Sequence, residues 1–103
     1  MGSEKLATYK TMTKEMFDQV EKSLGSHVVI LILEHAQWKT KEKYEEANLI
    51  QFSESGISLD GLDDIDPNQA EKIAHEFTMT IITSLGRLVG KELASKLTKY
   101  LEY

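Results

Sequence analysis

The sequence predicts an all-α domain of four helices, arranged as two helical hairpins with an acidic loop between them. Three observations lead to this prediction. Apolar residues recur three and four positions apart over long stretches, which is the period of an amphipathic helix. The chain has one proline, Pro67, so few positions interrupt a helix. Each predicted hairpin turns at the tripeptide Ser-Leu-Gly, at 23–25 and at 84–86, and glycine is preferred just past a helix end.

The first predicted helix follows a polar lead-in, residues 1–11, which we expect to be disordered or loosely docked. Thr11 or Thr13 can cap this helix because a threonine oxygen accepts a hydrogen bond from the free amides of the first turn. Gly25 is expected to end it. Its apolar face consists of Met16, Phe17, Val20 and Leu24.

The second predicted helix covers residues 26–47, with Ser26 as its N-cap. Its first part, 28–33, is entirely apolar and rich in β-branched residues, which favours a buried strand. The run continues without glycine or proline into good helix formers, which favours a helix. The alternative is an α+β fold in which residues 28–34 form a strand.

Turn-forming residues dominate the stretch from 48 to 65. Residues 49–52 and 57–59 flank the turn at 53–56 and can pair as a small β-hairpin. A two-stranded hairpin is marginal alone, so we expect it to pack against the helices.

The sequence Asp66-Pro67-Asn68-Gln69 predicts the start of the next helix. Asp66 suits the N-cap and Pro67 the first helical position. One helix from there to residue 103 would be about 55 Å long, whereas a compact domain of this size has a radius of gyration of about 13 Å. We therefore expect two helices, 67–85 and 87–102, that break at Gly86. One long helix used in oligomerisation is the alternative.

Composition indicates one domain spanning residues 1–103, with 41% hydrophobic and 28% charged residues. The absence of cysteine excludes a disulfide scaffold and thiolate metal ligands, and it suits a reducing compartment. The first residues lack the apolar segment of a signal peptide, and the apolar run 28–33 is too short to span a membrane. These features together lead us to expect a cytoplasmic location.

Charge is distributed unevenly along the chain. The net charge is −5, and residues 46–76 hold eight acids and one lysine. An acidic middle repels phosphate backbones, and no basic stripe compensates for it. The sequence therefore disfavours nucleic acid as a partner.

The order of elements resembles that of small all-helical archaeal domains of unknown function. The resemblance rests on the pattern of a helix, Leu-Gly and an aliphatic helix, followed by the acidic loop, a long helix and a second Leu-Gly with its helix. It implies a helical fold and no particular activity.

Four residues are candidate metal ligands. Asp64 and Asp66 are spaced like the first ligands of a calcium loop, but Gln69 stands where that loop needs glycine and His75 where it needs glutamate. Glu71 and His75 lie four residues apart and could bind a metal from one helix face. Since neither set is complete, we expect no tightly bound metal or cofactor. No catalytic motif is present, so we expect no enzyme.

A row of small residues marks the C-terminal part of the chain. Gly86, Gly90 and Ala94 recur every four residues and would let another helix approach closely. Leu97 and Tyr100 extend this predicted interface. The sequence thus favours a protein-interaction or regulatory module that forms a homodimer through its C-terminal helix. The alternative is a small-ligand or divalent-metal-binding domain that uses the acidic loop 60–66 with Glu71 and His75.

Overall fold

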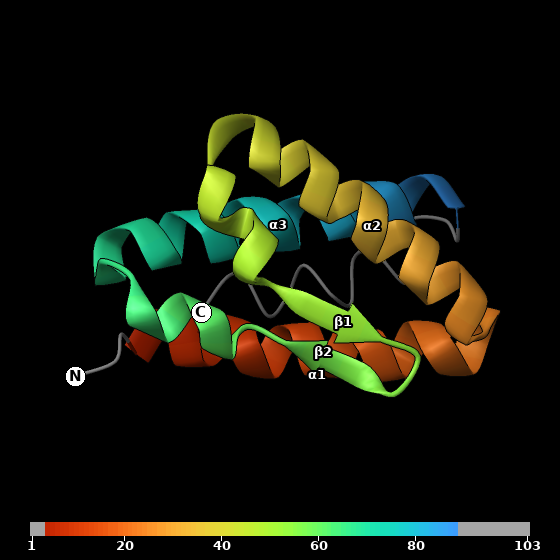
Figure 1. Ribbon diagram of the computed structural model, residues 1–103. Coiled ribbons are helices and arrows are strands. Elements are labelled where there is room, and N and C mark those ends of the chain that lie inside the picture. Colours follow the sequence, from red (N-terminus) through yellow and green to blue (C-terminus); the bar gives the residue numbers. More distant parts are fainter. Residues whose placement is uncertain (1–3, 89–103) are drawn as a thin grey trace.

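The computed structural model describes residues 4–88, which form a mostly helical compact domain. Its three α-helices are α1 (Glu4–Leu24), α2 (Ser26–Lys43) and α3 (Pro67–Leu88). Two short 3-10 helices, η1 (Glu45–Leu49) and η2 (Asp60–Asp64), and the strands β1 (Gln51–Ser53) and β2 (Gly56–Ser58) connect α2 to α3. Figure 1 shows the helices around one core, with the hairpin lying across α1.

The core lies where all three helices meet, and α3 contributes most of its fully buried residues. Phe77 is fully buried there, and the hairpin and both 3-10 helices add further apolar side chains. The fully enclosed members are Ala36, Ala47, Leu62, Ala70, Ile73, Ala74, Phe77 and Leu85. Burial of such side chains is the main favourable contribution to folding. No helix within residues 4–88 meets the length and hydropathy that a membrane span requires.

Residues 4–11 of the predicted lead-in are helical, because α1 already begins at Glu4. Leu6 is buried in the core, and its burial stabilises the first turns of the helix. The threonines expected to cap the helix lie inside it instead. Thr11 donates a hydrogen bond to the Ala7 carbonyl oxygen and Thr13 to that of Lys10, the back-bonding typical of threonine within a helix.

The segment 28–34 is helical, so the α+β alternative is wrong. The buried residues of α2 are spaced as on one helix face: Val29, Ile32, Leu33, Ala36 and Thr40. Ser26 is the first helical residue rather than the cap, because Gly25 occupies the cap position with φ +89°. That left-handed conformation suits glycine and separates α1 from α2 as predicted. The helix ends at Lys43, four residues before the predicted end, and η1 follows.

The small hairpin is confirmed. Its strands pair antiparallel, with Phe52 opposite Ile57 and Ser53 opposite Gly56 across the predicted turn. Ile57 is buried, and β2 packs against α1. The helices thus supply the support that a two-stranded hairpin needs.

The predicted break at Gly86 is wrong, because α3 continues through it to Leu88. Residues 4–88 therefore contain three α-helices and not four. Glycine inside a helix costs only about 1 kcal/mol relative to alanine, and full burial of Leu85 just before it stabilises the helical path. The remainder of the predicted helix 87–102 lies outside the described residues.

The predicted start of α3 is confirmed. The Gln69 amide donates a hydrogen bond to an Asp66 carboxylate oxygen at 3.2 Å, and the Ala70 amide donates to the Asp66 carbonyl oxygen at 2.8 Å. The Gln69 side chain does not bond back to Asp66 but approaches the Glu46 carboxylate at 3.5 Å. Asp66 is therefore the N-cap of α3.

Replacing this cap should cost stability. We expect Asp66→Ala to lower the free energy of unfolding by about 1 kcal/mol, the usual effect of removing an N-cap carboxylate. Urea unfolding monitored by circular dichroism measures the change. The matched control is Asn68→Ala, which alters an exposed residue of the same turn. Equal effects of the two substitutions would show that Asp66 does not act as a cap.

Candidate functional site

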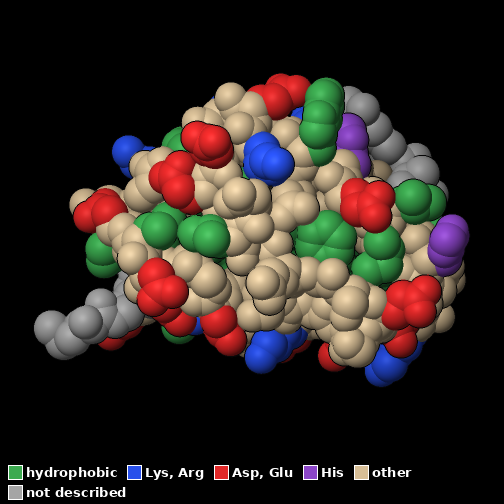
Figure 2. Space-filling model, in the orientation of Figure 1, with side chains coloured by type: hydrophobic (Ala, Val, Ile, Leu, Met, Phe, Trp, Pro, Cys, Tyr) green, Lys and Arg blue, Asp and Glu red, His purple; other side chains and the backbone are tan. Residues whose placement is uncertain are grey.

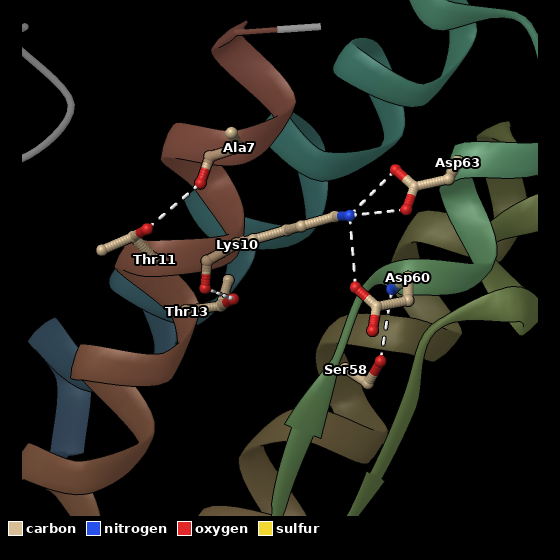
Figure 3. A network of polar contacts seen from close by, with 7 residues as sticks. All are labelled: Ala7, Lys10, Thr11, Thr13, Ser58, Asp60 and Asp63. Atoms are coloured by element: carbon tan, nitrogen blue, oxygen red, sulfur yellow. Dashed lines mark hydrogen bonds and ion pairs between the residues drawn. The ribbon is translucent and has the colours of Figure 1, made fainter. Parts of the chain in front are cut away.

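The acidic segment 60–66 contacts α1 rather than forming an open anionic loop. Figure 3 shows the Lys10 side chain reaching from α1 to two aspartates of η2. Lys10 Nζ lies 2.8 and 2.7 Å from the two carboxylate oxygens of Asp63 and 3.2 Å from Asp60 Oδ1. The Asp60 amide also donates a hydrogen bond to Ser58 Oγ at 3.2 Å. One lysine thus neutralises part of the acidic segment and fixes η2 against α1.

These ion pairs shift the pKa values of Lys10 and Asp60. The hydrogen bonds to Asp63 raise the pKa of Lys10 above its ordinary 10.5, although partial burial opposes the shift. The hydrogen bond from Lys10 lowers the pKa of Asp60 below its ordinary 3.8. Stability from Asp60 is therefore present above pH 3.8 and lost as the pH falls through the lowered value. Stability from Lys10 is present below pH 10.5 and lost as the pH rises through the raised value.

Removing the lysine charge should weaken folding only within that window. We expect Lys10→Gln to produce a small decrease in the urea midpoint at neutral pH, because exposed ion pairs contribute little. The difference from the parent should vanish towards both acid and alkaline pH. Urea unfolding between about pH 3 and about pH 11 tests this. The control is Lys22→Gln, an exposed lysine on the same helix. A difference that does not change with pH would contradict the ion-pair account.

His75 forms a hydrogen bond with Tyr9 of α1. Its Nδ1 lies 2.8 Å from the Tyr9 hydroxyl, and the two rings meet edge to face with centroids 5.8 Å apart. Burial and the nearby negative charge of Glu71 raise the pKa of Tyr9 above 10.0. A tyrosine phenol is protonated at neutral pH, so it can donate to His75. This pair connects the N-terminal half of α1 to α3.

The candidate metal ligands Asp64, Asp66 and His75 have separate roles and neighbours in the structure. Asp66 caps α3, and His75 bonds to Tyr9. Asp64 is exposed on η2, beside the residues held by Lys10. Within residues 4–88, no three His, Asp or Glu side chains are grouped so that they could hold a metal ion.

A groove of about 710 Å³ lies along the hairpin, away from the predicted ligands. Its lining is mixed polar and apolar, and includes Gln37, Asn48, Phe52, Ser53, Ser55 and Ser58. The Gln37 amide already donates hydrogen bonds to the carbonyl oxygens of Ala47, at 3.1 Å, and of Ile50, at 2.8 Å. Gln37 therefore fixes the chain between α2 and β1. None of the residues 60–66, Glu71 or His75 lines this groove.

The side of α2 opposite the core carries two large exposed hydrophobic residues. Leu31 is 55% exposed and Trp38, the only tryptophan of the chain, is 61% exposed. They lie seven residues apart, which places them on one helix face two turns apart. We call this surface the outward face of α2; its exposed members are His27, Leu31, Glu34, His35, Trp38, Lys41 and Glu42. Figure 2 shows histidine and hydrophobic side chains gathered along the edge of the molecule that α2 forms.

Charged and aromatic groups surround the two hydrophobic residues on this face. The His35 and Trp38 rings lie 6.5 Å apart and are tilted by 30°. This contact holds the indole against the helix while much of its surface stays exposed. A rigid aromatic side chain loses little conformational freedom when a partner covers it.

Sequence reasoning missed this face. The run 28–33 is entirely apolar in the sequence, but Leu31 belongs to it and is exposed. The signal that could have found the face is the spacing of Leu31 and Trp38 on the side of α2 opposite Val29, Ala36 and Thr40. The predicted interface at Gly86, Gly90, Ala94, Leu97 and Tyr100 lies outside the residues whose side chains are described.

Comparison with family models, curated proteins and solved structures found no match to this chain. Functional inference therefore depends on the residues of the chain itself.

Proposed function

We propose that this protein is a protein-interaction module that binds another polypeptide through the outward face of α2. The observation that carries the proposal is the exposure of Trp38 and Leu31 on one helix face. Aromatic residues are enriched in interfaces, and tryptophan is among the residues that contribute most binding energy. A helix face with such anchors two turns apart has the geometry of helix recognition.

Several residues of the alternative ligand or metal site already make contacts within the fold. Asp60 and Asp63 pair with Lys10, Asp66 caps α3, and His75 bonds to Tyr9. These contacts join elements of the fold. Each gives its residue a structural role that needs no ligand. The alternative function, a small-ligand or metal-binding domain built on segment 60–66 with Glu71 and His75, therefore has less support. Self-association through the C-terminal helix stays a prediction.

Site-specific photo-crosslinking tests the proposal. A photoreactive phenylalanine analogue replaces Leu31 in the full chain, which is expressed in cells and irradiated. We expect a covalent adduct heavier than the monomer, because a partner must cover residue 31. The matched control carries the same analogue at Lys72, an exposed residue of α3. Absence of an adduct from position 31, or equal adducts from both positions, would contradict the proposed function.

A further inference from the structure

We propose that the partner on the outward face of α2 is a second copy of this chain, with the two α2 helices antiparallel. This inference rests on the proposed function and names its occupant. The exposed residues of α2 are arranged symmetrically along the helix. A two-fold axis midway between Glu34 and His35 would place Leu31 opposite the partner's Trp38, and Trp38 opposite the partner's Leu31. Each copy would then offer the same patch to the other, as an isologous interface requires.

The hydrogen-bonding groups on this face are complementary in the same register. Glu34 falls opposite the partner's His35, and His27 falls opposite the partner's Glu42, on each side of the axis. A histidine ring has at least one N–H donor in either protonation state, and a carboxylate accepts. All four of these side chains are exposed in the described structure. The antiparallel arrangement therefore places an acceptor opposite each histidine.

A parallel arrangement lacks this complementarity. It would bring Glu34 next to the partner's Glu34 and each histidine next to the same histidine of the partner. Like charges placed together in an interface are unfavourable. Antiparallel helices also align their dipoles favourably. The residues of the outward face thus select one orientation of a second α2.

The small apolar area predicts a weak, reversible dimer. Each copy contributes two large hydrophobic residues, Leu31 and Trp38. Interfaces of this size lie at the low end of the range for specific complexes. We therefore expect a dimer that forms as the protein is concentrated and separates on dilution.

Sedimentation velocity of the full chain tests this inference, at concentrations from about 10 μM to about 1 mM, where small interfaces associate and dissociate. The parent should shift towards the dimer as its concentration rises. Glu34→Lys should weaken dimerisation at least about tenfold, because it removes the carboxylate that accepts a hydrogen bond from the partner's His35, twice per dimer. The double variant Glu34→Lys with His35→Glu exchanges the charges and should restore the dimer. Glu21→Lys, a matched charge change at an exposed residue of α1, should leave it unchanged.

The outcomes separate this inference from the proposed function. A parent that stays monomeric throughout, while the crosslinker at position 31 captures a different protein, would overturn self-pairing and leave the proposed function standing. A monomer without any crosslink would overturn both. A dimer that Glu34→Lys does not weaken, or that the charge exchange does not restore, would show that the copies meet elsewhere. Circular dichroism of each variant confirms that the helices are intact.

Discussion

Phe77→Ala should lower the free energy of unfolding by about 3–5 kcal/mol, the range for removing a buried phenylalanine. Phe77 is fully buried in α3, the helix that packs against both α1 and α2. The substitution removes apolar contacts and leaves a cavity that a close-packed interior fills only in part. Domains of this size have total stabilities of about 5–15 kcal/mol, so the variant should be close to unfolding. Urea unfolding at neutral pH measures the change.

Met79→Ala is the matched control for this substitution. Met79 lies two residues further along the same helix but is 38% exposed. We expect a much smaller loss, because little apolar surface returns to water and no cavity forms. Similar losses at both positions would contradict the orientation of α3 in this fold.

Gly61→Ala should lower the free energy of unfolding by about 1–3 kcal/mol through overpacking. Gly61 lies in η2, where a Cβ atom would come within 2.7 Å of the Leu49 carbonyl oxygen and 3.1 Å of Leu49 Cβ. The first of these neighbours is backbone, so η1 and η2 would have to separate. Relief of this clash would also disturb Leu62, which is fully buried next to Gly61.

Thermal and urea unfolding of Gly61→Ala beside Asp64→Ala test this packing. Asp64 is an exposed residue of the same 3-10 helix, and its substitution should change stability little. If Gly61→Ala is as stable as the parent, η1 and η2 do not approach each other as closely as the structure indicates.

Local signals in the sequence determined several elements correctly. The Asp-Pro-Asn-Gln opening predicted the cap of α3, and Gly25 predicted the end of α1, because both depend on the conformation of a few neighbouring residues. The hairpin around residues 53–56 was predicted for the same reason. Elements that depend on packing were predicted less well. The start of α1 depends on burial of Leu6, and the course of α3 past Gly86 follows burial of Leu85.

The candidate site was harder to predict because it depends on which elements meet. The acidic residues of 60–66 were identified in the sequence, but their partner Lys10 lies about fifty residues away, and no local pattern connects them. His75 was likewise identified without Tyr9. The outward face of α2 went unrecognised because the exposure of Leu31 depends on which side of the helix packs against α1 and α3.

The most direct test of the outward face of α2 uses the single tryptophan of the chain. Incorporation of 5-fluorotryptophan gives one ¹⁹F resonance, which reports on Trp38 alone. Spectra are recorded for the dilute labelled protein, after addition of excess unlabelled protein, and after addition of a cell extract. We expect the resonance to shift and broaden when unlabelled protein is added, because a second α2 covers the indole. A resonance that stays the same in all three samples would contradict the claim that this face binds a polypeptide.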